Sequence, residues 1–200
     1  MFFINACGYK NEKNTQYFCE RLTLNCNKKE NIVVFYTSKG ILKIKLFDDS
    51  NPVTVANFIS KVKSNIYVNK NFYKIINYSN NKLIQSGLNK ENELGEMNIK
   101  DAEGIESIPL EIKLNNKEPI YETYIVNPLE IKNLRHKFVK GSLSMVKINK
   151  KRSSSTEFFF TSNNLPEFDG RYSIFGIVIS GSEILDEIDK NDLIKKIEFH

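Results

Sequence analysis

Short runs in which apolar and polar residues alternate are the clearest pattern along the chain. In residues 41–47 (ILKIKLF), leucine or isoleucine alternates with lysine, which is the two-residue period of an antiparallel strand with one solvent-exposed face. The apolar run 32–37 precedes it across the turn Ser38-Lys39-Gly40, so the two runs predict a hairpin. Further runs bounded by turn residues predict strands at residues 71–76, 82–86, 142–146, 157–161, 173–179 and 193–199.

Two segments have the spacing of helices instead. Asn51 and Pro52 form a helix-start signal, and apolar residues then recur every three or four positions as far as residue 64. Ser180 and Glu183 have the spacing of a capping box, which predicts a second, shorter helix over residues 180–188.

Residues 88–135 form an irregular, charged insertion in this pattern. Glycine and proline are spaced there so that no long helix fits, and only 108–114 and 120–126 have strand character. Residues 32–200 therefore predict one mainly β, antiparallel domain with two helices. Closure of its sheet into a barrel would remove the exposed strand edges.

Residues 1–31 predict a polar N-terminal extension. Residues 9–31 are rich in Asn, Lys and Glu, and they indicate either a tether or a marginal helix. Residues 4–8 (INACG) resemble the end of a bacterial lipoprotein signal with Cys7 as the lipidated residue, although the apolar part is shorter than a secretory signal needs. Two interpretations stay open: a start inside a longer signal of an exported, lipid-anchored protein, or the ordinary frayed terminus of a cytoplasmic one.

The cysteines and histidines point to no metal or cofactor chemistry. Cys19 and Cys26 would form a small disulfide in an oxidising compartment and would otherwise remain two free thiols. The two histidines, His136 and His200, stand alone, and no Cys/His cluster has metal-ligand spacing. We therefore predict no metal and no cofactor.

Composition narrows the function classes further. A chain of 200 residues with 40% hydrophobic residues can bury one substantial core, so we expect a one-domain monomer. With 29 basic and 24 acidic residues the net charge is +5, and the basic loop at residues 147–152 is typical of a solvated loop, so we do not expect nucleic-acid binding. No run reaches the roughly 18 apolar residues of a membrane-spanning helix.

Seven short motifs, taken in their order along the chain, resemble the cyclophilin family of peptidyl-prolyl cis-trans isomerases, with most similarity to bacterial-type members. The motifs are Thr37-x-x-Gly40-Ile41, Pro52-Val53-Thr54-Val55-Ala56-Asn57-Phe58, Phe72-Tyr73-Lys74-Ile75-Ile76, Gln85-Ser86-Gly87, Gly141-Ser142-Leu143-Ser144-Met145, Glu157-Phe158-Phe159-Phe160, and Phe168-Asp169-Gly170-Arg171-Tyr172 leading into Phe175-Gly176. The resemblance covers roughly residues 32–200. It implies a closed eight-stranded antiparallel β-barrel capped by two α-helices.

The resemblance also implies an activity and its residues. Cyclophilins isomerise X-Pro bonds, so the implied partners are proline-containing peptide segments or unfolded client proteins. Lys74 matches the arginine that acts as cationic donor near the prolyl nitrogen, and Gln85 matches the glutamine that anchors the substrate carbonyl. The positions that match substrate-binding residues are Phe72, Leu83, Val146, Lys147, Glu157, Phe159, Phe168 and Tyr172.

Several of these positions depart from the family pattern. Lys74 lacks the planar fork of arginine, and Glu157 stands where the family has a second glutamine. The segment Val146-Lys147-Ile148 is bulkier than the family's usual substrate-binding strand edge. Two hypotheses follow: an isomerase with reduced activity, or a catalytically degenerate module that binds proline peptides or acts as a chaperone. Faster cis-trans exchange of an X-Pro peptide would distinguish the first from the second.

Overall fold

The protein is mainly β, as the sequence predicts. The computed structural model describes residues 14–27, 31–78, 81–88 and 107–200. Its helices are α1 (Thr15–Arg21), α2 (Pro52–Lys63) and α3 (Pro128–Lys132), with 3-10 turns η1 (Pro166–Phe168) and η2 (Ser182–Asp186). Its strands are β1 (Ile32–Thr37), β2 (Ile41–Leu46), β3 (Lys70–Asn71), β4 (Lys74–Tyr78), β5 (Asn81–Ser86), β6 (Ser107–Pro109), β7 (Glu111–Ile112), β8 (Ile120–Tyr121), β9 (Ser142–Lys147), β10 (Arg152–Thr161), β11 (Ile174–Ser180) and β12 (Leu193–Phe199). None of the helices in these ranges has the length and apolar character needed to cross a membrane.

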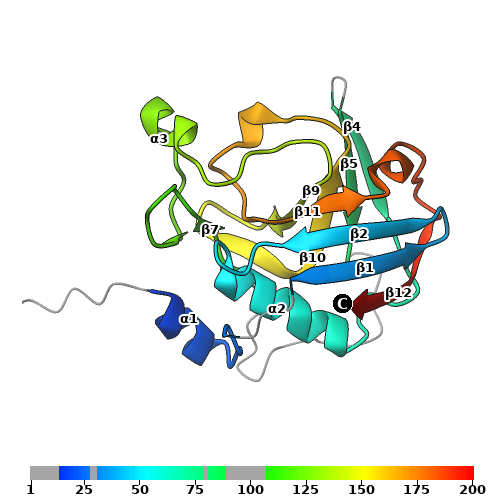
Figure 1. Ribbon diagram of the computed structural model, residues 1–200, viewed down its shortest axis with the longest axis horizontal. Coiled ribbons are helices and arrows are strands. Elements are labelled where there is room, and N and C mark those ends of the chain that lie inside the picture. The colour runs from blue at the N-terminus through cyan, green and yellow to red at the C-terminus, as the bar shows by residue number, and fades with distance from the viewer. Residues whose placement is uncertain (1–13, 28–30, 79–80, 89–106) are drawn as a thin grey trace, which may run out of the picture.

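A strongly curled antiparallel sheet organises the molecule (Figure 1). Its strands follow the order β3-β12-β1-β2-β11-β9-β10-β5-β4, and β6 pairs with β10. The eight longer strands correspond to the predicted barrel strands, and the short β3 and β6 bring the sheet to ten within the described ranges. Only Phe72 and Tyr73 separate β3 from β4, and the Ser86 hydroxyl donates to the Asn71 carbonyl (3.0 Å), so the two ends of the sheet come together.

The main hydrophobic core lies inside the curl, where α2 packs against the sheet. Figure 1 shows α2 beneath β1 and β10. Phe58 from α2 contacts the rings of Phe35, Phe158 and Phe175, and all four side chains are fully buried. The helical spacing of apolar residues in the sequence predicts that the side of α2 that carries Phe58 is buried. The start of α2 at Pro52 also agrees with the prediction.

The prediction of a second helix over residues 180–188 is wrong both in the type of helix and in its capping box. Residues 182–186 form the 3-10 turn η2, and Ser180 remains the last residue of β11. Gly181 precedes the turn with a φ of 85°, and a Cβ there would lie 2.1 Å from the Ile41 carbonyl oxygen. Because the chain must turn at this left-handed residue, no capping box forms between Ser180 and Glu183.

Some predicted strand bounds also differ from the structure. The predicted strand 71–76 is divided into β3 and β4, and the weak runs 108–114 and 120–126 form only the short strands β6, β7 and β8. Strand β10 begins at Arg152, inside the predicted basic loop, because Arg152 and Ser153 pair with Pro109 and Ile108 of β6. This pairing between distant segments leaves no local pattern in the sequence.

A buried carboxylate caps the N-terminus of α2. Asn51 is the N-cap residue but makes no side-chain capping bond, and its Nδ2 donates instead to the Glu111 carbonyl (2.9 Å). The Glu111 carboxylate is fully buried and accepts hydrogen bonds from Val53 N–H (3.2 Å), Thr54 N–H (2.8 Å), the Thr54 hydroxyl (2.7 Å) and the Tyr121 hydroxyl (2.9 Å). A helix N-terminus favours a negative charge, so Glu111 takes the role that the sequence assigns to Asn51.

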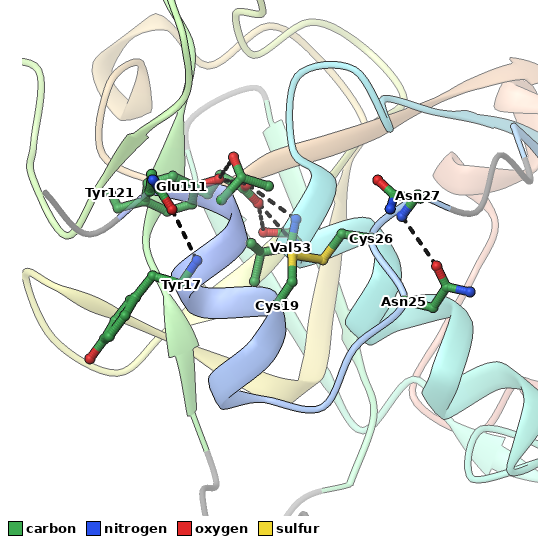
Figure 2. The surroundings of a disulfide bond; sticks show 11 residues. Tyr17, Cys19, Asn25, Cys26, Asn27, Val53, Glu111 and Tyr121 are labelled. Carbon is green, nitrogen blue, oxygen red and sulfur yellow. Dashed lines mark hydrogen bonds between the residues drawn. A yellow bond between two sulfur atoms is a disulfide. The ribbon is translucent and has the colours of Figure 1, made fainter.

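Helix α1 joins the domain through the same network. The Thr15 and Tyr121 hydroxyls are hydrogen-bonded (2.7 Å), and the fully buried Phe18 ring lies 4.8 Å from that of Tyr121. Cys19 and Cys26 form a disulfide, one of the two alternatives left open by the sequence (Figure 2). Residues 15–21 are therefore a helix packed on the core, and Thr15 and Phe18 join it to Tyr121 of β8.

We expect reduction of the Cys19–Cys26 disulfide to destabilise the protein. A cross-link over a sequence separation of 7 restricts the unfolded chain, which corresponds to about 2 kcal/mol of folding free energy. Urea unfolding with and without dithiothreitol measures the loss. The double variant Cys19→Ser/Cys26→Ser should match the reduced protein and be insensitive to the reductant; an oxidised protein no more stable than this variant would contradict the assignment.

We also expect Glu111 to make stability depend on pH. Burial raises its pKa from 4.5 to about 7, although the hydrogen bonds from Thr54, Tyr121 and Val53 oppose the shift. The folded state then binds this proton more tightly than the unfolded state, so stability is lost as pH rises through the window from 4.5 to about 7. The urea midpoint of the wild type, relative to that of Glu111→Gln, should fall between about pH 4 and pH 8. A relative midpoint that rises over this range would contradict the raised pKa.

Candidate functional site

A row of paired residues crosses the outer face of the sheet, opposite the main core. Directly opposed residues of an antiparallel pair point to the same face. The register aligns Lys74 of β4 with Gln85 of β5, and Gln85 with Phe159 of β10. Three residues that are distant in sequence therefore share one surface.

Four aromatic rings, which we call the outer aromatic cluster, lie at one end of this row. They belong to Phe138, Phe159, Phe168 and Tyr172. Phe138 stacks on Phe159 (5.9 Å between centroids), and Phe168 stacks on Tyr172 (5.0 Å), while Tyr172 meets Phe159 edge-on (5.5 Å). Leu83, Leu165, Ile174 and the half-buried Val146 pack in the same cluster. The structure thus brings together five of the positions that match substrate-binding residues of the family, namely Leu83, Val146, Phe159, Phe168 and Tyr172.

Phe138 is the member of this cluster that the sequence reasoning missed. It is 2% exposed, and its backbone N–H donates to Asp169 Oδ1 (2.8 Å), which fixes the segment before β9 against the Asp169-Gly170 turn. Burial raises the pKa of Asp169, although this hydrogen bond opposes the shift. The available signal was the apolar pair Phe138-Val139 between Lys137 and Lys140, and a pair of adjacent residues carries no periodicity.

A hydrogen-bonded trio forms the polar part of the site. The Gln85 amide donates to the Tyr73 hydroxyl, which in turn donates to Glu157 Oε1 (2.5 Å). Gln85 and Glu157 are both half-buried. Tyr73 was not among the predicted site residues, and its role follows only from the spatial proximity of β10 to the β3–β4 connection.

The Lys74 side chain is exposed at the end of the row. Among the residues that the structure describes, no hydrogen bond or ion pair is recorded for its ammonium group. Phe72, by contrast, is fully buried in the main core, so the structure does not place it on this face. Lys74 and Gln85 thus share the outer face of the sheet. Phe72, which the sequence predicts to bind substrate, packs in the core on the other side of the sheet.

Lys147 lies beside the outer aromatic cluster. Its ammonium nitrogen is 4.9 Å from the centroid of Tyr172 and 5.5 Å from that of Tyr124. Burial would lower the pKa of Lys147, but interactions with the two tyrosines outweigh it and hold the pKa above its usual value. Lys147 is therefore a fixed positive charge at the edge of the site.

His136 belongs to the fold rather than to this surface. Its ring stacks on Phe47 (3.7 Å), and its Nε2 is hydrogen-bonded with the Ser50 hydroxyl (3.0 Å). Burial lowers the pKa of His136 to about 4, so the ring is neutral near pH 7. Within the described ranges, no three His, Cys, Asp or Glu side chains are grouped so that they could hold a metal ion.

Comparison with known proteins gives one family throughout. The sequence profile described as "Cyclophilin type peptidyl-prolyl cis-trans isomerase/CLD" matches residues 32–198. Human peptidyl-prolyl cis-trans isomerase-like 3 is 29% identical over 158 residues, which cover 79% of this chain and 81% of that protein. Peptidyl-prolyl cis-trans isomerase B of Escherichia coli is 28% identical over 165 residues, covering 78% of this chain and 83% of that one.

Solved structures agree with this result. The crystal structure of a cyclophilin type peptidyl-prolyl cis-trans isomerase from Cryptosporidium parvum, in the presence of the dipeptide Ala-Pro, superposes with a TM-score of 0.59 and 26% identity over 84% of this chain and 98% of that chain. A cyclophilin from Hirschia baltica superposes with a TM-score of 0.60 at 16% identity, which supports the fold.

We expect Phe138 to be essential for the packing of the outer aromatic cluster. Phe138→Ala should lower the free energy of unfolding by about 3 kcal/mol, because it leaves a cavity against Phe159, Phe168 and Tyr172. The matched control is Val139→Ala, at a neighbouring side chain that is 39% exposed. Urea unfolding measures both variants, and equal losses would contradict the packing described.

Proposed function

The chain belongs to the cyclophilin-type peptidyl-prolyl cis-trans isomerase family, and on this premise we propose that it accelerates the rotation of X-Pro bonds in protein segments, at a reduced rate. The observation that carries the proposal is the row formed by Lys74, Gln85 and Phe159 beside an aromatic cluster. The Ala-Pro dipeptide in the crystals of the Cryptosporidium relative supports a proline-containing ligand.

The reaction needs neither a nucleophile nor a cofactor. Resonance gives the amide C–N bond double-bond character and a rotation barrier of about 18–20 kcal/mol. The two isomers of an X-Pro bond differ by only about 1 kcal/mol, so the barrier alone limits the rate. A surface that binds the twisted amide more tightly than either planar isomer lowers that barrier.

The residues of the row have distinct proposed roles. The outer aromatic cluster holds the proline ring by apolar contact, because Phe159 and Tyr172 present ring faces and edges to it. Gln85 binds the carbonyl that precedes the proline. When the X-Pro bond twists, the lone pair of the prolyl nitrogen leaves the amide resonance. The Lys74 ammonium group then donates towards this nitrogen, an interaction that exists only in the twisted state.

Two features account for a reduced rate. Lys74 offers a compact charge on a flexible chain, whereas the family's arginine offers a planar set of donors, so less of the twisted state is stabilised. The Gln85 amide already donates to Tyr73, and its Nε2 also lies 3.5 Å from Glu157 Oε1, so a substrate carbonyl competes with these two groups for its N–H donors. The same two features favour the second candidate, a proline-peptide binding module without turnover.

We expect the protein to accelerate cis-trans exchange in a short X-Pro peptide, as measured by two-dimensional exchange NMR. Lys74→Ala and Gln85→Ala should each reduce the acceleration about tenfold or more, because each removes an interaction with the twisted amide. Lys74→Arg should raise it several-fold, because the planar donor set is restored.

The matched control is Lys43→Ala, which removes an exposed lysine from β2. It should leave the exchange rate unchanged. Binding of the peptide without any acceleration by the wild type or Lys74→Arg would support the binding module instead, and a loss of acceleration in Lys43→Ala equal to that in Lys74→Ala would contradict the role of Lys74.

A further inference from the structure

A cation held between two tyrosines lies next to the proposed proline pocket. Lys147 is near the end of β9, and its ammonium group lies over the rings of Tyr172 and Tyr124. Tyr172 is itself a member of the outer aromatic cluster and stacks on Phe168. A ligand that contacts the cluster therefore passes close to the Lys147 charge.

The insertion fixes Tyr124 in this position. Its described residues form a small hydrophobic core of their own, which contains Leu110, Ile112, Leu114, Ile125 and Leu134, with Tyr124 packed against it. The Ile125 N–H donates to the Gly170 carbonyl (2.9 Å), which ties the insertion to the turn that precedes Tyr172. A Cβ on Gly170 would lie 2.3 Å from the Ile125 carbonyl oxygen, so glycine permits this close approach.

The Lys147 charge is not neutralised by a carboxylate of the described residues. The ammonium group interacts instead with Tyr124 and Tyr172. Of the glutamates near this end of the sheet, Glu122 pairs with Arg152 (3.1 Å), and Glu157 accepts the hydrogen bond from Tyr73. A half-buried lysine whose ammonium group lies over aromatic rings keeps N–H donors that an anionic ligand can use.

We propose that Lys147, Tyr124 and Tyr172 form a subsite for a carboxylate side chain close to the proline, so that the protein prefers acidic X-Pro segments. This inference rests on the proposed function, since it concerns the segment that the same surface binds. Consecutive Cα atoms are about 3.8 Å apart, so a residue one or two positions from a proline on the outer aromatic cluster is within reach of Lys147.

The physical reason for selectivity is the fixed position of the charge. A free surface lysine must lose side-chain entropy before it can pair with an anion, and such pairs contribute little. The Lys147 ammonium is already positioned by Tyr124 and Tyr172, which reduces this cost. The neutral amide analogue of the acidic side chain gains no such charge pairing.

A set of matched peptides tests the proposal. Each peptide contains one X-Pro bond, with Glu or Gln placed in turn at one of the two residues on either side, and NMR titration gives both dissociation constants. For at least one position we expect the wild type to bind the Glu peptide about fivefold more tightly than the Gln peptide. The ratio of the dissociation constants of the Gln and Glu peptides should fall towards one in Lys147→Gln and at high salt, because the selectivity is electrostatic.

Two variants serve as controls for this ratio. Lys147→Arg keeps the charge and should keep the preference for Glu. Lys150→Gln removes one positive charge from the exposed neighbouring loop and should also keep it. Loss of the ratio in Lys150→Gln to the same extent as in Lys147→Gln would assign the effect to net charge and overturn the subsite.

The remaining outcomes separate this proposal from the proposed function. Equal binding of Glu and Gln peptides at every position overturns the acidic preference but leaves isomerisation and proline binding intact. No binding and no accelerated exchange with any peptide overturns the proposed function itself. Tighter binding of a phosphoserine peptide without any preference for Glu would show that the subsite takes phosphate and overturn its assignment to carboxylates.

Discussion

Phe158, Phe159 and Phe160 occupy consecutive positions of β10, and the two-residue period of a strand sends them to opposite faces of the sheet. Phe158 and Phe160 contact Phe35 in the main core, whereas Phe159 stacks on Phe138 outside. A shift of the register by one residue would exchange the two faces and destroy both the core and the site. The pairing of β10 with β5 and β9 is therefore the constraint on which the core and the candidate site jointly depend.

The buried Glu111 carboxylate is the second organising element. It joins the N-terminus of α2 to β7, and through Tyr121 it reaches Thr15 of α1. The N-terminal helix and the insertion are thereby attached to the same domain as the barrel strands. The insertion then continues to Tyr124, so a segment that resembles an irregular loop in the sequence lies beside Lys147 at the edge of the site.

Local patterns predict most of the sheet and part of the site. The alternation in residues 41–47 gives β2, and the helical spacing after Pro52 gives α2, because both depend on neighbouring residues alone. Phe138, Tyr73 and Tyr124 were missed, since their contacts join segments that are distant in sequence. The start of β10 was misplaced for the same reason, because its pairing with β6 depends on a partner in the insertion.

The central claim is that a proline ring binds on the outer aromatic cluster with its amide towards Lys74 and Gln85. Intermolecular nuclear Overhauser effects between a bound X-Pro peptide and the protein test it most directly. The account predicts contacts from the proline ring protons to the rings of Phe159, Phe168 and Tyr172. Contacts confined to another surface, such as α2 or the exposed face of β2, would contradict it.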